Sequence, residues 1–329
     1  MNRRLSWWRV AVLLLGCVAL ASADRPEAKI LRSGQAYRDR ADFPEMIVVP
    51  AGTAMATEKP TLDGSAGTKE PPRLIHVPKA IAVGKYPVTL SEFATFVRQT
   101  GWKSVGDCYV WLDNGSVADQ WAASSRANWR SPGFHQTPRD PVVCVNLRDA
   151  NAYVRWLNSK LRKDGNWRAN RPYRLPSKDE FEYFARGGAT TRYPWGDTIS
   201  RAKANYGRDD CFPCGGARAG ADRWKYTSPV GSFPSNGFGL FDVSGNVWQR
   251  TIGDIWGFPG CAEPVDPDVC IDTRPNYHGY GAGGAAFGGG WNSDPRYIEI
   301  GQQLLLQTMN RNVVTGFRVV RDLDDKDAQ

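Results

Sequence analysis

The sequence predicts a single α+β domain with little regular secondary structure. Of its 329 residues, 41% are hydrophobic and 12% aromatic, enough to bury a large core. Three segments carry clear helix start and stop signals, whereas the rest consists of short β-like runs between long stretches rich in Gly, Pro, Asn, Asp and Trp. Long irregular segments need contacts that hold them in place, and disulfides, metal ions and buried tryptophans can supply these contacts.

The first 23 residues form a predicted signal peptide. Three arginines within the first nine residues precede an apolar run from Val10 to Ala21, and Ala21-Ser22-Ala23 supplies a small-x-small cleavage pattern. Export to the periplasm is therefore expected. A retained membrane anchor and a frayed cytosolic terminus are weaker interpretations, and acylation of Cys17 would tether the mature chain to the membrane.

The charge pattern gives no support to nucleic-acid binding. The full chain carries +8, and removal of three arginines with the signal peptide leaves +5 (8 minus 3). No run of Lys and Arg with interleaved aromatics occurs in the sequence. A negatively charged periplasmic surface or an acidic partner stays open, beside the simpler interpretation of scattered, solvated charge.

Six cysteines remain after cleavage, and an even number in an oxidising compartment indicates disulfides. They are Cys108, Cys144, Cys211, Cys214, Cys261 and Cys270. The sequence does not choose among their fifteen pairings. The pair at 211 and 214 has redox-motif spacing but lies in a loop, so a local structural disulfide is the preferred interpretation.

Three helices are predicted, each with a capping box. The first covers 89–101, with Thr89 as N-cap and Gly101 as the stop. The second starts at Asn146, and the third starts at Ser177 and stops at Gly187. Short strands are expected in "EMIVVPAG" and "LIHVPKAIAVG".

The densest local signal is "NGFGLFDVSGNVWQR", residues 236–250. The Asp242 carboxylate, the carbonyls of Gly245 and Val247 and the Gln249 side-chain oxygen are oxygen ligands on a tight turn, which suit Ca²⁺. The alternative is an Asx-turn at Asp242 held by ordinary hydrogen bonds.

At these residues the chain resembles the sulfatase-modifying factor, or formylglycine-generating-enzyme, superfamily. Nine blocks occur in the family's order, among them "PEMIVVPAG", "YRLPSKDEFEYFARGG", "GGGWNSDPR" and "GFRVVRD". They cover residues 44–322, leaving 24–43 as an N-terminal extension and 323–329 as a polar tail. The resemblance implies a C-type-lectin-like fold of low regular structure.

The resemblance also implies two calcium sites. The first would use the Asn205 side chain, the Tyr206 carbonyl, Asp222 and the Trp224 carbonyl. The second would use Asp242, Gly245, Val247 and Gln249. Gln249 stands where Glu is usual and Arg250 where Trp is usual, which removes an anionic ligand and adds a cation at the second site.

The family's oxidase chemistry is expected to be absent. Its copper-binding cysteine pair would align near Ser293 and Ile298, and neither residue offers the soft thiolate that Cu(I) prefers. No copper is therefore expected. The histidines His76, His135 and His278 are isolated in the sequence, so surface or loop roles are expected for them.

One carboxylate of the same stretch is a weak catalytic candidate. Glu299 would act as a general base in a pocket walled by Trp291. The structural interpretation has Asp294 and Arg296 paired to hold the turn, and Arg318 bracing the core.

The leading functional hypothesis is an exported, non-oxidase family member that binds a periplasmic or membrane protein, similar to periplasmic regulators upstream of a type VI secretion Ser/Thr kinase. The alternative is a periplasmic maturation enzyme that uses a pocket carboxylate, similar to the family member that matures the pyoverdine chromophore. Carbohydrate binding is a third interpretation. A binding role would use an aromatic surface, expected around Trp121 and Trp129.

Overall fold

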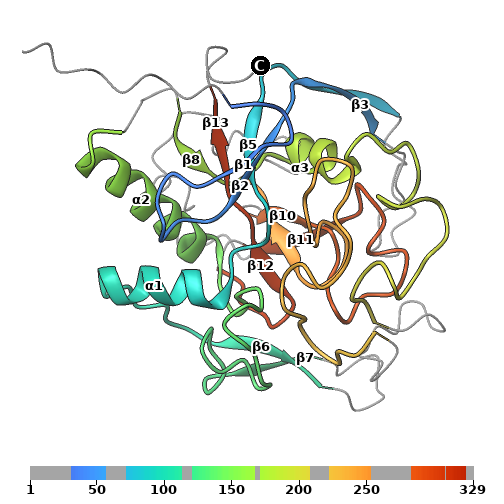
Figure 1. The fold of residues 1–329 in the computed structure, drawn as a ribbon. Helices are drawn as coiled ribbons and strands as arrows, with labels where there is room; N and C mark the ends of the chain where they lie inside the picture. The colour runs from blue at the N-terminus through green and yellow to red at the C-terminus, as the bar shows by residue number, and fades with distance from the viewer. Residues whose placement is uncertain are drawn as a thin grey trace, which may run out of the picture.

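The computed structural model of this chain describes residues 31–56, 72–112, 121–166, 171–207, 222–252, 283–307 and 309–323. The helices are α1 (Leu90–Thr100), α2 (Leu147–Lys163) and α3 (Lys178–Arg186). In Figure 1, α1 and α2 lie on the left of the central strands and α3 lies on the right. The strands are β1 (Ala36–Tyr37), β2 (Met46–Val49), β3 (Gly52–Ala56), β4 (Arg73–Val77), β5 (Ile81–Gly84), β6 (Cys108–Trp111), β7 (Trp121–Ser124), β8 (Tyr173–Arg174), β9 (Trp248–Arg250), β10 (Gly283–Phe287), β11 (Gln303–Gln307), β12 (Thr315–Phe317) and β13 (Val320–Asp322).

The three predicted helices are confirmed together with their caps. Each helix has a reciprocal capping box, in which the N-cap side chain accepts from the third helical N–H and that residue's side chain accepts from the N-cap N–H. α1 and α3 stop at Gly101 and Gly187, both in the left-handed conformation.

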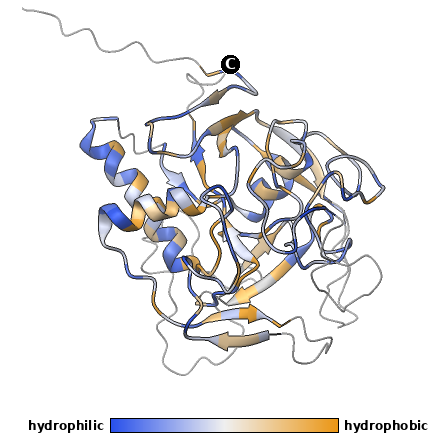
Figure 2. Cartoon of the chain, turned by 60° about the horizontal axis from the view of Figure 1, so that its bottom comes forward, coloured by the Kyte–Doolittle hydropathy of each residue, from blue (hydrophilic) through white to orange (hydrophobic). Residues whose placement is uncertain are grey.

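A five-stranded antiparallel sheet forms the centre, in the order β1-β2-β5-β13-β8. Alternate residues of β2 enter different cores: Met46 and Val48 face the side of α1 and α2, whereas Ile47 and Val49 face the side of α3. The sheet is therefore buried on both faces. The outer sides of α1 and α2 are hydrophilic (Figure 2).

The N-terminal edge of the domain lies before the first family block. β1 pairs with β2, and Phe43 is fully buried against Trp156 and Tyr173. Part of the 24–43 extension is thus integrated into the central sheet and its core.

A second sheet of four strands carries the residues that lead into the candidate site. Its order is β11-β10-β9-β12, with β12 parallel to β9 and the other pairs antiparallel. Two hairpins, β3-β4 and β6-β7, complete the strands. The predicted α+β fold with low regular structure is confirmed.

No helix in the described ranges is long and apolar enough to cross a membrane. The predicted signal peptide, Cys17 and the four cysteines from Cys211 to Cys270 lie outside those ranges, as does the tail after Leu323.

Candidate binding site

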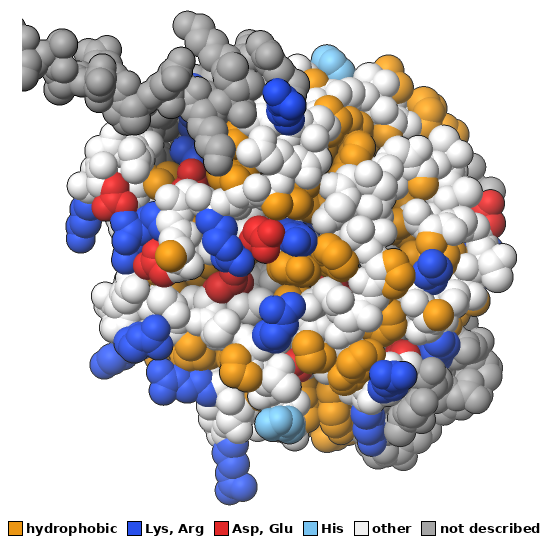
Figure 3. Space-filling view, in the orientation of Figure 1, with side chains coloured by type: hydrophobic (Ala, Val, Ile, Leu, Met, Phe, Trp, Pro, Cys, Tyr) orange, Lys and Arg blue, Asp and Glu red, His pale blue; other side chains and the backbone are white. Residues whose placement is uncertain are grey.

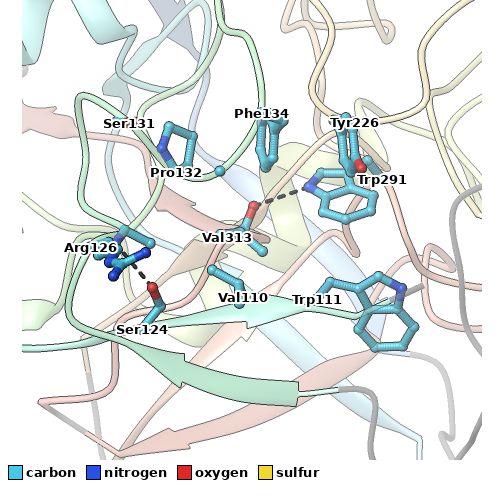
Figure 4. Close-up of a pocket in the computed structure, with 12 residues that line it drawn as sticks. Val110, Trp111, Ser124, Arg126, Ser131, Pro132, Phe134, Tyr226, Trp291 and Val313 are labelled. Atoms are coloured by element: carbon cyan, nitrogen blue, oxygen red, sulfur yellow. Dashed lines mark hydrogen bonds between the residues drawn. The ribbon is translucent and has the colours of Figure 1, made fainter. Parts of the chain in front are cut away.

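A cavity of about 320 Å³ opens between the β6-β7 hairpin and the turn that follows β10 (Figure 4). Val110 and Trp111 of β6 and Ser124 of β7 form one wall. The facing wall is aromatic, and segment 126–134 closes the remaining side. The lining residues are Val110, Trp111, Ser124, Arg126, Ala127, Ser131, Pro132, Gly133, Phe134, Tyr226, Trp291 and Val313.

Three aromatic rings build the facing wall. Phe134 and Tyr226 stack with their ring centroids 4.4 Å apart and an interplanar angle of 6°. The Trp291 ring meets both edge-on, at 5.8 Å and 5.0 Å. Because the Trp291 indole N–H donates to the Val313 carbonyl at 3.0 Å, the ring is fixed in orientation. The wall is rigid, with a preformed aromatic corner.

The glycines before Trp291 place it in this corner. Gly288 and Gly289 have φ values of +93° and +72°, which favour glycine. A Cβ on Gly289 would lie 2.4 Å from Cγ2 of Ile298, so the backbone passes directly over that side chain. The triple glycine after β10 is therefore a packing requirement as well as a turn.

At Ser293 and Ile298, where the family's copper pair is expected, the side chains make structural contacts. The Ser293 hydroxyl accepts from the backbone N–H of Gly290 at 2.9 Å, which closes the turn. Ile298 is fully buried in a small cluster with Tyr193, Ala204 and Tyr206. Both positions serve the structure of the turn.

The weak catalytic candidate Glu299 does not line the cavity. Its Oε1 accepts from Nε of Arg192 at 3.0 Å and also from Nη2 of the same guanidinium. An ion pair of this kind holds the carboxylate away from the Trp291 corner, contrary to the expected position beside the pocket.

The structural interpretations of the neighbouring charges are confirmed. Asp294 Oδ1 accepts from the Arg296 backbone N–H at 2.9 Å, and the two side chains are 3.9 Å apart. Arg318 is fully buried, and its guanidinium donates to the carbonyls of Gly84 and Phe241 and to Oε1 of Gln249. Burial lowers the pKa of Arg318 to about 9, although nearby Asp242 opposes this shift.

The cavity's hairpin wall is fixed by a disulfide. Cys108 at the start of β6 is bonded to Cys144, which precedes α2, and both are buried. The outer edge of β6 also pairs with residues 311–313, through Tyr109 N–H to the Arg311 carbonyl and Val313 N–H to the Tyr109 carbonyl. The covalent bond and the ladder together hold Val110 and Trp111 opposite Trp291.

The first predicted calcium set is assembled around a buried, partly unsatisfied pocket. Asn205 is 1% exposed, and its Oδ1 has no hydrogen-bond partner among the described residues. The Asp222 carboxylate is buried, which raises its pKa despite N–H donation from Trp224. Nη1 of Arg201 donates to the Tyr206 carbonyl at 2.6 Å and lies 3.6 Å from Asp222 Oδ2. The orphaned amide oxygen and the carboxylate are oxygen donors that a hard cation prefers, whereas the Arg201 guanidinium already occupies the Tyr206 carbonyl and places a positive charge beside them.

The residues of the second predicted calcium set are hydrogen-bonded to one another and to neighbouring protein groups. Asp242 Oδ2 accepts from Gly231 N–H at 2.8 Å, and the Gly245 carbonyl accepts from Val247 N–H at 3.0 Å. Gln249 donates to the Asp242 carbonyl at 2.7 Å and accepts from Arg318 at 2.8 Å. These ordinary hydrogen bonds match the alternative to calcium, although the described bonds to the Asp242 side chain come from Gly231 and Asn246 and not from the N–H two residues on that defines an Asx-turn.

The Arg250 side chain does not lie at the second predicted calcium set, where its charge was expected. Its guanidinium donates to the Asn310 carbonyl and lies near Asp149 and Arg311, away from the 242–249 turn. Burial lowers the pKa of Arg250 to about 10. The exposed His76 and His135 belong to no group of three or more His, Cys, Asp or Glu side chains in the described residues that could hold a metal ion.

The expected aromatic surface is only half present. Trp121 is 41% exposed and meets Trp111 edge-on at 5.0 Å. Trp129 is 6% exposed because it packs edge-on against Phe93 of α1 at 5.2 Å. The prediction that Trp129 lies on an exposed patch is therefore wrong.

Most residues of the cavity carry no recognisable signal in the sequence. Phe134 and Tyr226 come from loops with no motif, and the hairpin residues show only weak alternation of polar and apolar side chains. Of the lining residues, Trp291 carries a sequence signal, which is the triple glycine before it.

Comparison with known proteins gives one consistent result. A family model described as the sulfatase-modifying factor enzyme 1-like domain matches residues 33–323. The formylglycine-generating enzyme of Bos taurus is 32% identical over 248 residues, which cover 67% of this chain and 60% of that protein. The enzyme of Mycobacterium tuberculosis is 35% identical over 213 residues, covering 54% and 65%. The chain thus spans less than two thirds of either relative.

Two further similarities bear on function and fold. The protein named inactive C-alpha-formylglycine-generating enzyme 2 of Bos taurus is 32% identical over 230 residues, covering 63% of this chain and 69% of that protein. The solved structure of PvdO from Pseudomonas aeruginosa matches with a TM-score of 0.64 and 26% identity, covering 88% of this chain and 99% of that one.

Proposed function

Because this chain belongs to the sulfatase-modifying factor enzyme 1-like family, we propose that it is a member without oxidase activity that works by binding. The cavity beside Trp291 receives an apolar or aromatic group of a partner protein. One observation carries this proposal: the aromatic corner is complete, while Ser293 and Ile298 stand at the positions of the family's thiolates. Function resides in such side chains and not in the fold.

The cavity suits one bulky side chain. Its volume of about 320 Å³ is at the small end of ligand sites, and its walls are mainly aromatic and aliphatic. Rigid rings that are already paired lose little conformational entropy when a guest enters. Arg126 is exposed and belongs to the lining, so it supplies a positive charge at the rim.

Copper oxidation of a peptide thiol has no support at this turn. The reaction needs a sulfur ligand that can also engage the substrate thiol. Ser293 Oγ is committed to the Gly290 N–H, and Ile298 is fully buried. The relative named as inactive supports the view that this scaffold serves roles other than catalysis.

In this proposal the protein acts in the periplasm. The Cys108–Cys144 bond is consistent with an oxidising compartment. The specific role is regulatory, with the partner a periplasmic or membrane protein, of the kind that acts upstream of a type VI secretion Ser/Thr kinase. Membrane association would come through that partner or through acylation of Cys17.

A maturation enzyme that uses a carboxylate is the second candidate, and one observation favours it. Asp294 is 2% exposed, and its Oδ2 has no hydrogen-bond partner among the described residues. Burial raises the pKa of Asp294 in spite of its hydrogen bond from Arg296, as a general acid requires. Glu299 is the weaker choice because Arg192 already pairs with it.

Site-specific photo-cross-linking in the periplasm tests the binding role. A benzophenone side chain at Arg126 should capture one defined protein, whereas the same probe at exposed Lys203, outside the cavity, should not. Phe134→Ala should lower the capture at position 126, since it removes half of the ring stack.

Two results would overturn the proposal. Stoichiometric copper on free thiols with aldehyde formation on a cysteine peptide would establish oxidase activity. Loss of the protein's cellular function in the Asp294→Asn variant, while cross-link capture and folding stay intact, would favour the maturation enzyme.

A further inference from the structure

A second hollow lies beside α1, apart from the cavity beside Trp291. It measures about 590 Å³ and lies between α1 and the segment that contains Trp129. None of its lining residues borders the first cavity. The lining comprises Leu90, Ala94, Val97, Arg98, Gly101, Trp102, Trp129 and Arg130.

The floor of this α1 groove is apolar and preformed. Leu90, Ala94 and Val97 follow one another at helical spacing along one stripe of α1. Trp129 is held by its edge contact with Phe93, and the Trp102 indole donates to Asp149 Oδ1 at 3.0 Å. Both indoles are fixed, so the hollow exists before any partner arrives.

Two arginines, Arg98 and Arg130, line the groove, and a third, Arg148, lies beside it over the Trp102 ring. The Arg130 guanidinium lies 4.6 Å from the centre of the Trp129 ring, and that of Arg148 lies 5.6 Å from the centre of the Trp102 ring. Arg98 donates to the Thr95 hydroxyl one turn earlier in α1. Within the described ranges, none of these three arginines forms an ion pair.

Other arginines of the described structure do have acidic partners. Elsewhere Arg174 bonds both Glu180 and Asp322, and Arg321 pairs with Asp39. The buried carboxylate of Asp149, which accepts from the Trp102 indole, is already taken up by Arg311, Ser104 and the α2 cap. Figure 3 shows Lys and Arg side chains around apolar ones at the lower left of this face.

We propose that the α1 groove is a docking site for an acidic polypeptide segment of a partner protein, which places two or three apolar side chains on the floor and carboxylates against the three arginines. The charge complementarity selects an acidic partner, and the apolar stripe selects one with spaced aliphatic or aromatic residues. This surface is separate from the cavity of the proposed function, and either can fail without the other.

Other anionic partners fit the geometry less well. Nucleic-acid bases need open ring faces, but guanidinium groups already lie over Trp129 and Trp102. A lipid surface needs protruding apolar side chains, whereas Val97 and Trp129 are at most 9% exposed. A narrow peptide can enter a recess that these partners cannot.

Fluorescence anisotropy with the full-length protein and defined probes tests the site. The acidic probe is a labelled peptide of about fourteen residues with Leu at helical spacing and Glu elsewhere, and the basic probe replaces every Glu by Lys. The acidic probe should bind and weaken as salt rises. The double variant Arg98→Glu, Arg130→Glu should weaken its binding at least about tenfold and improve binding of the basic probe.

The controls separate charge and folding from docking. Arg32→Glu with Lys203→Glu makes the same charge change at two exposed residues outside the groove and should leave binding within about twofold. Ala94→Trp fills the floor without changing any charge, and it should also weaken binding of the acidic probe. Circular dichroism melting identifies any variant that fails to fold.

The refuting outcomes are specific. The docking site is wrong if the matched-charge control weakens the acidic probe as much as the groove variant does. It is also wrong if Ala94→Trp and the groove variant, both folded, bind like wild type. Tighter binding to oligo-dT or to phosphatidylglycerol vesicles than to the acidic probe would assign the surface to those ligands instead.

Discussion

Replacing Cys108 and Cys144 together by alanine should lower the free energy of unfolding by about 5 kcal/mol. The bond joins the start of β6 to Cys144, two residues before the α2 N-cap, and it lies in the core cluster that contains Trp248 and Trp291. Alanine is the better replacement, because serine would bury an unsatisfied hydroxyl.

The magnitude follows from the length of the closed loop. A sequence separation of 36 residues gives a loop-closure entropy that corresponds to about 4 kcal/mol at room temperature. Loss of two buried sulfur atoms, at residues 0% and 1% exposed, adds about 1 kcal/mol of packing. The sum is a large share of the stability of an ordinary domain.

Urea unfolding followed by circular dichroism measures the change, with wild type and variant compared without reductant. Reductant is omitted because it would also reduce any disulfides among the remaining cysteines. Mass spectrometry of the unreduced wild type verifies the bond. The variant should also bind less well at the Trp291 cavity, because β6 supplies Val110 and Trp111.

An unfolding midpoint within the error of wild type would refute the reasoning. So would a large loss of stability with unchanged binding at the cavity, since the hairpin would then be held without the bond.

Trp291→Ala should lower the free energy of unfolding by about 4 kcal/mol. Trp291→Phe should lower it by about 1 to 2 kcal/mol, because it keeps an aromatic ring but loses the bond to the Val313 carbonyl and part of the buried ring volume. Equal losses for the two variants in urea titrations would contradict this. Burial raises the pKa of Asp42, but hydrogen bonds from basic and amide side chains outweigh it and hold this pKa at about 2, below the usual 3.8. The ionised form therefore stabilises the fold above pH 4 and its contribution is lost as pH falls towards 2, so the stability difference between wild type and Asp42→Asn should shrink over that window. Calcium should raise the melting temperature of the chelator-treated protein, an increase that Asp222→Asn removes and Asp242→Asn leaves, whereas the opposite pattern would assign calcium to the second set.

Local signals predicted the helices because capping is a local phenomenon. Thr89 with Glu92, Asn146 with Asp149, and the matching pair in α3 lie three residues apart, so their hydrogen bonds are legible in the sequence. The same holds for the turn between Asp294 and Arg296.

The cavity was hidden because its walls meet only in three dimensions. Phe134 stacks on Tyr226, which is far along the chain, and no periodicity links the two. Exposure of single aromatics was equally hard to predict: Trp129 is covered by Phe93 from α1, a contact between segments that no local pattern reports. The Glu299 partner Arg192 is distant for the same reason.

The placement of β13 bears on when the central sheet can form. β13 lies between β5 and β8 and is bonded to both, although it follows them by a long stretch of chain. Until residues 320–322 have been synthesised, the central sheet has a gap where its fourth strand belongs. The sheet is therefore completed only by a strand that is distant in sequence from its neighbours, and folding of its centre waits for that strand.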